Sequence, residues 1–247
     1  MPVGLTEDYR LNLDAMASAV TDQTKMIFVC NPNNPTGTIN SKAEVESFLA
    51  RIPENVLIVL DEAYCDFADD PAYPDSLQYL GKYENIAVLR TFSKIMGLAA
   101  QRIGYIMTNQ ALIESMQRVR QPFPVNRTVQ AGAIASLEDH DFVRKTLELN
   151  REGKKQYQDA FDQLGLTYTD SQTNFVYVEL PGLSGELVFE QMLREGVIVR
   201  PQTTAGRPSA LRITIGSTVD NERTIAALTR AIIQSNKDRS VCSGKND

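Results

Sequence analysis

The chain has 247 residues, of which 43% are hydrophobic, and a formal net charge of −6. This length allows one large domain or two modest ones, with enough apolar side chains for a buried core. An acidic chain has no electrostatic reason to bind nucleic acid or an anionic membrane, and no apolar stretch approaches the roughly 20 residues that a bilayer requires. The composition favours a globular protein that acts on small molecules.

Cysteine and histidine usage narrows the chemistry further. Cys30, Cys65 and Cys242 lack metal-type spacing, and no signal-like segment opens the chain, so we expect a reducing, cytoplasmic setting. His140 is the single histidine, and its acidic neighbours predict a helix start with a solvated or capping side chain. Histidine-based triads and multi-histidine metal sites are therefore disfavoured.

The first half alternates apolar strands with helices. Strands are expected at 25–30, 55–60, 85–91 and 102–108, and Ser41 with Glu44 predicts the start of a helix that runs to about residue 52. This pattern is typical of an open, mostly parallel α/β sheet. Ligands collect at the carboxyl ends of such strands, where Asn34, Asp61, Tyr64 and Lys94 fall.

The second half predicts a smaller α+β domain. Helices are expected at 111–121, 127–138, 142–165, 184–196 and 219–234, and strands at 174–180, 197–200 and 210–216. We therefore predict a large α/β domain at 1–137, a small domain with the linking helix at 138–238, and a disordered polar tail at 239–247.

Lys94 is the first candidate for chemistry. Desolvation and the nearby Arg102 would lower the pKa of its amine, and such an amine forms imines with carbonyl groups. The alternative is a lysine whose charge extends to water at a strand end. Asp61 follows five apolar residues, where a carboxylate needs a cation such as a protonated pyridine nitrogen; its alternative is a helix cap.

Further polar residues surround these two. Tyr64 presents a phenol or is simply a packed aromatic, while Asn34 precedes a proline in a turn that Gly37 completes with positive φ. Two hydroxyls and a guanidinium near Lys94 form a reasonable phosphate-binding set: Thr91, Ser93 and Arg102.

Four motifs carry a family resemblance. In order, "NPNNPTG", "DEAY", "TFSKIMGLAAQRIGY" and "RITIG" resemble the fold-type I pyridoxal-phosphate aminotransferases, with wording most similar to histidinol-phosphate aminotransferases, up to about Gln234. The absence of G-x-G-x-x-G after any strand disfavours a Rossmann-type dehydrogenase.

The resemblance implies a role for each candidate residue. Lys94 would form the Schiff base with pyridoxal 5'-phosphate and shuttle the proton, and Asp61 would pair with the pyridinium nitrogen. Tyr64 and Asn34 would bind the ring 3′ oxygen. The cofactor phosphate would be held by Thr91, Ser93 and Arg102. Arg212 would hold the substrate carboxylate, and Arg200 would meet the substrate phosphate or side chain or serve as an ordinary surface charge.

The implied activity is transamination between histidinol phosphate and 2-oxoglutarate in histidine biosynthesis, by a homodimer. The alternatives are an aromatic amino-acid aminotransferase, a phosphothreonine decarboxylase-like enzyme, or a non-catalytic fragment that packs against a full-length partner. Family members usually have about 350 residues or more, so we expect the N-terminal third to be missing, with its phosphate-binding loop. Residues 1–247 alone are therefore expected to bind the cofactor weakly or not at all.

Overall fold

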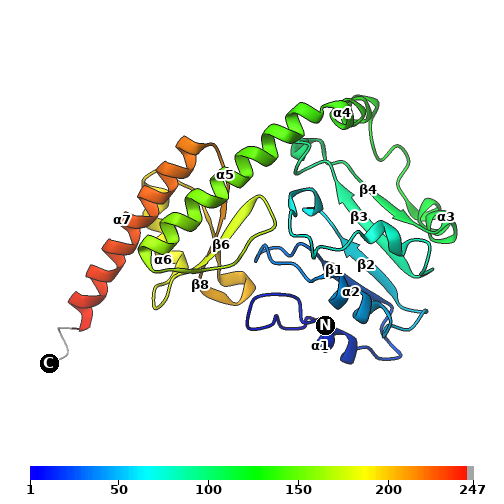
Figure 1. The fold of residues 1–247 in the computed structure, drawn as a ribbon, viewed down its shortest axis with the longest axis horizontal. Coiled ribbons are helices and arrows are strands. Elements are labelled where there is room, and N and C mark those ends of the chain that lie inside the picture. Colours follow the sequence, from blue (N-terminus) through cyan, green and yellow to red (C-terminus); the bar gives the residue numbers. More distant parts are fainter. Residues whose placement is uncertain (244–247) are drawn as a thin grey trace. The chain divides into compact units, whose positions relative to one another are not determined.

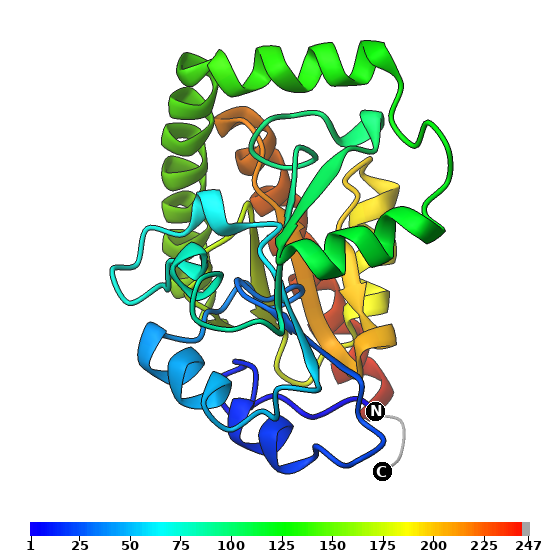
Figure 2. The same ribbon diagram turned by 90° about the vertical axis from the view of Figure 1, so that its right-hand side faces the viewer.

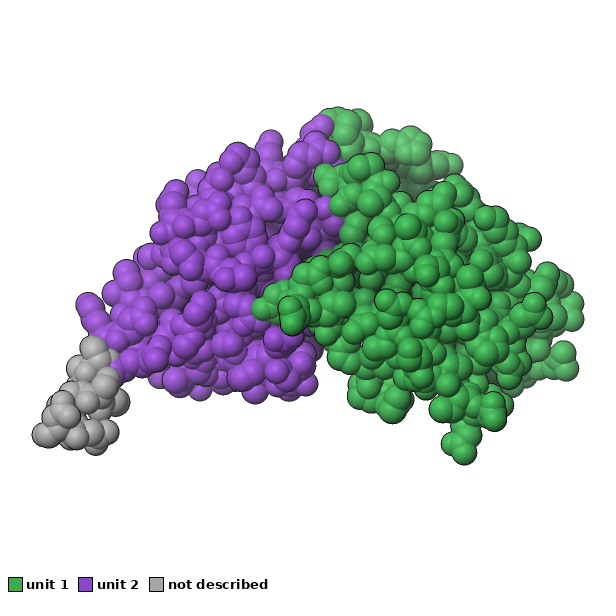
Figure 3. Space-filling model, turned by 60° about the horizontal axis from the view of Figure 1, so that its bottom comes forward, with its two compact units in different colours: residues 1–34, 38–146 green, residues 35–37, 147–247 purple. Residues whose placement is uncertain are grey.

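The computed structural model describes residues 1–243, which divide into two compact units. Unit 1 comprises residues 1–34 and 38–146, and unit 2 comprises residues 35–37 and those from 147 onward (Figure 3). The predicted boundary after residue 137 lies near this division. The division itself falls inside the continuous helix α5, His140–Leu164, because the first turns of that helix group with unit 1.

Unit 1 is built on a four-stranded sheet with the order β1-β2-β3-β4 (Figure 1). Its strands are Met26–Cys30 (β1), Leu57–Asp61 (β2), Ile86–Thr91 (β3) and Gly104–Thr108 (β4). β1, β2 and β3 are parallel, and β4 is antiparallel to β3. The prediction of a mostly parallel α/β sheet is therefore confirmed.

Helices and short turns precede, connect and follow the strands of this sheet in the chain. They are α1 (Leu13–Ser18), α2 (Lys42–Leu49), α3 (Gln110–Val119) and α4 (Arg127–Glu138), with 3-10 turns η1 (Cys65–Phe67), η2 (Ser76–Tyr79) and η3 (Ala99–Gln101). α1 and α2 pack side by side (Figure 2). The Ser41 hydroxyl accepts from Glu44 N, and Ser41 N donates to the Glu44 carboxylate, which confirms the predicted helix start.

The core of unit 1 follows from strand alternation. Every second residue of the parallel strands, such as Val29, Ile58 and Val88, is fully buried in one cluster with Phe48 and Leu49 of α2. Because successive strand residues point to opposite faces, the odd-numbered positions that end β2 and β3, Asp61 and Thr91, project away from this core.

Unit 2 is an antiparallel sheet with the order β5-β6-β8-β7. Its elements are β5 (Thr167–Tyr168), β6 (Phe175–Glu179), α6 (Gly185–Arg194), β7 (Arg200–Gln202), η4 (Thr203–Ala205), β8 (Arg207–Thr214) and α7 (Thr218–Ser243). Val176, Val178, Leu211 and Ile213 form one core with residues of α5, α6 and α7, including the fully buried Val188.

Two expectations for unit 2 differ from the structure. The strand predicted at 197–200 begins only at Arg200, because Val197 and Val199 bury their side chains without pairing in the sheet. α7 extends to Ser243, so the segment from residue 239 predicted to be disordered is helical that far, as a continuation of the helix that begins at Thr218. Residues 244–247 of that predicted tail lie outside the described part. No helix within residues 1–243 could cross a membrane.

Candidate active site

The carboxyl ends of the parallel strands bring the first group of predicted residues to one edge of the unit 1 sheet. Asp61 ends β2 and pairs in register with Cys30 of β1 and Leu89 of β3. Thr91 ends β3, and Lys94 follows three residues later. This edge is where open α/β sheets bind ligands.

Lys94 is half-buried beside an aromatic face. Its Nζ lies 5.0 Å from the centroid of the Tyr64 ring, and Tyr64 is buried just beyond the end of β2. A cation over an aromatic face is attracted by the ring quadrupole, which holds the amine without using its N–H donors. No hydrogen bond or ion pair within residues 1–243 occupies this nitrogen, so the amine is available to a ligand.

The half-buried carboxylate of Asp61 has few hydrogen-bond partners near it in the chain. Its Oδ1 accepts one hydrogen bond, of 3.1 Å, from the backbone N of Ala63, and no described lysine or arginine forms an ion pair with it. Burial, and secondarily the Asp61 charge, raises the pKa of the Cys30 thiol to about 11. The thiol therefore stays protonated near neutral pH.

Thr91, Ser93 and Arg102 lie on the chain around Lys94. The Thr91 hydroxyl accepts from Ser93 N at 3.0 Å and donates to Ile103 O at 3.4 Å. Arg102 ends η3 with φ 52°, a left-handed conformation that non-glycine residues seldom adopt. Its exposed guanidinium donates to Ala99 O at 3.1 Å, which leaves most of its five N–H donors for other groups.

Hydrogen bonds of the buried Asn31 anchor the turn that carries Asn34. The buried Asn31 side chain donates to Asn40 O at 3.0 Å and accepts from Asn40 N at 2.9 Å, and Tyr73 Oη donates to Asn31 O at 2.7 Å. Asn34 itself is exposed, and Gly37 has the predicted positive φ, 75°. A rigid base thus supports an exposed amide.

The two predicted arginines belong to unit 2. Arg200 of β7 and Arg212 of β8 are register partners in the antiparallel pair, so their side chains share one face. The half-buried Arg212 places its Cζ 4.8 Å from the centroid of the Phe175 ring, while Arg200 is exposed. The aromatic face attracts the Arg212 guanidinium, and the planar shape of a guanidinium suits bidentate binding of a carboxylate.

The sequence reasoning missed a second acid at the strand edge. Glu62, next to Asp61, is 2% exposed, and its Oε2 lies 2.9 Å from Nε and 2.8 Å from NH2 of Arg90. Glu62 thus has a cationic partner within the chain, whereas the cation predicted for Asp61, a protonated pyridine nitrogen, would come from a ligand. Arg90, a charge inside the apolar strand at 85–91, was the signal that could have revealed this pair.

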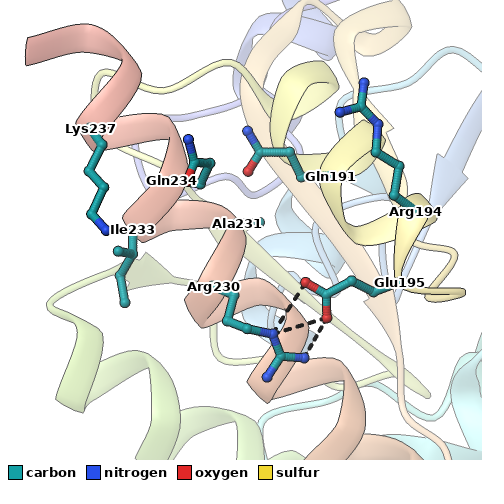
Figure 4. A pocket seen from close by; sticks show the side chains of 8 residues that line it. All are labelled: Gln191, Arg194, Glu195, Arg230, Ala231, Ile233, Gln234 and Lys237. Carbon is teal, nitrogen blue, oxygen red and sulfur yellow. Dashed lines mark hydrogen bonds and ion pairs between the residues drawn. The ribbon is translucent and has the colours of Figure 1, made fainter. Parts of the chain in front are cut away.

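Two concave surfaces contain none of the predicted residues. A groove of about 350 Å³ beside β1 is mostly apolar and includes Leu11, Met16 and Phe28. Another, of about 600 Å³, lies between α6 and α7 (Figure 4). In it Arg230 Nε donates to Glu195 at 3.0 Å, so the charges there neutralise each other in part.

Solved structures define the class of fold. The crystal structure of histidinol-phosphate aminotransferase from Sinorhizobium meliloti in complex with pyridoxal-5'-phosphate is similar, with a TM-score of 0.88 and 28% identity over 95% of this chain and 64% of that chain. The fold is thus that of an aspartate-aminotransferase-like enzyme. The family model "Aminotransferase class I and II" matches residues 1–229, and the chain belongs to this family.

Curated relatives agree with the structural comparison. Histidinol-phosphate aminotransferase from Brevibacillus brevis is 48% identical over 88% of this chain, and histidinol-phosphate aminotransferase 1 from Cupriavidus pinatubonensis is 47% identical over 91%. The chain spans about 60% of the length of these relatives. The resemblance read from the four motifs is confirmed at the level of the family.

Proposed function

We propose that the chain serves pyridoxal-phosphate-dependent transamination of histidinol phosphate with 2-oxoglutarate, to imidazole acetol phosphate and glutamate. One observation carries the proposal. An amine without a hydrogen-bond or ion-pair partner and a carboxylate without a cationic one, Lys94 and Asp61, lie at the carboxyl edge of one sheet among the described residues. The names of the relatives supply the substrate.

The donor set fits pyridoxal phosphate group by group. Lys94 matches its aldehyde, and Asp61 matches its ring nitrogen. Tyr64 and Asn34 would hold the ring oxygen. The phosphate would be held by Thr91, Ser93 and Arg102. When bound, the cofactor supplies an electron sink for the negative charge that develops at the substrate Cα.

The chain's own residues would then do the following work. The Lys94 amine would take the proton from the substrate Cα and return it, since the single histidine, His140, lies exposed at the start of α5. Asp61 would keep the ring nitrogen protonated by its negative charge. Arg212 would bind the α-carboxylate of 2-oxoglutarate through two N–H donors, and Arg200 would contact the phosphate of histidinol phosphate.

The proposed substrates are small molecules, an amino donor and a 2-oxo acid, and the proposed assembly is a homodimer. Phosphate on the donor is the feature that would distinguish this substrate from aromatic amino acids. The Arg200 and Arg212 register pair places two arginines side by side, which supports binding of the donor phosphate and, in the other half-reaction, of the carboxylates of 2-oxoglutarate.

The test is reductive trapping. Because the sequence predicts weak binding, pyridoxal phosphate is added up to millimolar concentration; borohydride reduction and peptide mass spectrometry should then find the cofactor on Lys94. Lys94→Ala should abolish trapping, while Lys42→Ala, at an exposed lysine of α2, should leave it intact. Absence of trapping on Lys94 would contradict the proposal and favour a non-catalytic module.

Substrate choice is tested separately by turnover. Histidinol phosphate with 2-oxoglutarate should give glutamate faster than phenylalanine or tyrosine does. Arg212→Lys should raise the KM for 2-oxoglutarate at least tenfold, because a lysine cannot bind its carboxylate bidentately. Faster turnover of aromatic donors, or carbon dioxide release from phosphothreonine, would replace the proposed substrate.

A further inference from the structure

Resting on the proposed function, we propose that the buried ion pair Glu62–Arg90 is a positioning device. It holds Asp61 and the Thr91–Lys94 segment in the geometry that binds pyridoxal phosphate. Neither residue touches the ligand in this proposal; both act through the backbone of their neighbours.

The ion pair has two short hydrogen bonds and is largely buried. Glu62 is 2% exposed, the Arg90 side chain is 24% exposed, and one carboxylate oxygen accepts from both Nε and NH2 of the guanidinium, at 2.9 and 2.8 Å. Ser76 of η2 adds a side-chain hydrogen bond to the same carboxylate. Charge-assisted bonds of this kind resist small displacements because each would leave a buried charge unsatisfied.

The ion pair can act on the candidate site because its two residues are next to site residues in the chain. Glu62 directly follows Asp61, and Arg90 directly precedes Thr91. Glu62 N also donates to Leu89 O at 2.9 Å, so pairing of the two strands continues past the last residue of β2. The ion pair therefore clamps β2 to β3 at the edge where the candidate site lies.

Strand alternation places the clamp behind the site. Even-numbered positions of β2 and β3, such as Ile58 and Val88, face the core formed with α2, and Glu62 and Arg90 continue those two rows. Asp61 and Thr91 point to the other face. The clamp can therefore act on the site without occupying space in it.

The positive charge of Arg90 interacts with several titratable neighbours. Its charge acts on Glu62, Cys65, Asp66 and the Tyr73 hydroxyl. Loss of the guanidinium would leave Glu62 charged and buried, so the strand ends should separate or take up water. A change in Arg90 should consequently disturb the site more than a change in Glu62 to a neutral isostere.

The experiment compares cofactor binding by folded variants. Glu62→Gln, Arg90→Met and the double variant are checked by circular dichroism, and the Kd for pyridoxal phosphate and the rate of borohydride trapping on Lys94 are measured. We expect Arg90→Met to weaken binding at least tenfold and Glu62→Gln at least threefold. The double variant should lose no more than Arg90→Met alone, because both changes break one clamp.

Two control variants separate positioning from general stability. Ile86→Val shortens a core side chain at the far end of β3, and Arg10→Met breaks the partly exposed Arg10–Glu44 ion pair of 2.7 Å in the same unit. Both should keep the wild-type Kd. The pH at which the absorbance of the bound cofactor changes should shift in the clamp variants and stay unchanged in the controls.

The possible results separate the role of the ion pair from the proposed function. Wild-type Kd, trapping rate and absorbance profile in folded Glu62→Gln and Arg90→Met would overturn the clamp and leave the proposed function intact. Failure of the wild-type chain to bind the cofactor or to trap it on Lys94 would overturn the proposed function itself. If Arg90→Met does not fold, Glu62→Gln, which keeps the shape of the side chain, decides alone.

Discussion

At the scale of single residues, two adjacent acids have different surroundings. Asp61 keeps a carboxylate without an ion-pair partner in the described chain, while Glu62, one peptide further on, is buried and paired with Arg90. Alternation along a strand accounts for this, since neighbours point to opposite faces. The acid available for a ligand and the acid used for structure are thus separated by one residue.

Burial gives Glu62 a testable pH signature. Desolvation raises the pKa of its carboxyl above the ordinary value of 4.5, and the bonds from Ser76 and Arg90 offset this only in part. A raised pKa in the folded state favours the protonated form. Its contribution to stability is therefore present below about pH 4.5 and is lost as the pH rises through the folded-state pKa.

We therefore expect the unfolding free energy of the wild-type chain, minus that of Glu62→Gln, to fall as the pH rises from 4.5. Urea unfolding at a series of pH values measures this difference. Asp66 and Asp75, whose charges lie nearby, are present in both proteins, so their titration largely cancels. A difference that rises with pH would show that Arg90 outweighs burial.

At the scale of elements, the turn after β1 is held both by its own backbone conformation and by hydrogen bonds to residues far along the chain. Its glycine, Gly37, has φ 75°, and its carbonyl accepts from Gln172 N at 2.8 Å. Thr169 donates to Thr36 O at 2.5 Å. Residues 35–37 therefore belong to the packing of unit 2, although they are only a few positions from β1.

Gly37→Ala should destabilise the chain by about 2 kcal/mol or more, because both its backbone angle and its surroundings exclude a side chain. A Cβ there would lie 2.9 Å from the Cβ of the buried Ser171. Gly81→Ala is the matched control, since its Cβ would meet nothing within 4 Å. Urea unfolding measures both, and equal effects would contradict the steric explanation.

At the scale of the whole molecule, two separate cores divide the stabilising contacts. One contains Val29, Ile58 and Val88, and the other contains Val188 and Leu211. Apolar burial is short-ranged, so a cavity should weaken chiefly the unit in which it is made.

Val188→Ala should cost about 2 kcal/mol and speed hydrogen exchange in β6 and β8, because the fully buried side chain leaves a cavity next to them. Ile58→Ala is the reciprocal variant and should act on β1 and β2. Hydrogen exchange followed by mass spectrometry resolves the two sheets. Faster exchange of β1 and β2 in Val188→Ala would argue against separate cores.

Local chemistry determined a large part of this protein from the sequence alone. Apolar runs predicted β1, β2 and β3, the Ser41 and Glu44 spacing predicted the start of α2, and Gly37 has the predicted positive φ. Such signals depend on neighbours within a few positions, so they can be read without a fold. The motifs around Lys94 likewise identified the family.

Tertiary structure alone decided which distant groups meet. The Glu62–Arg90 pair joins residues 28 positions apart, and the register of Arg200 with Arg212 depends on how β7 pairs with β8. Val197 and Val199 are apolar like strand residues, but core packing holds them outside the sheet. Burial and pairing are properties of the folded chain, and for that reason the sequence identified the candidate lysine but not the ion pair behind it.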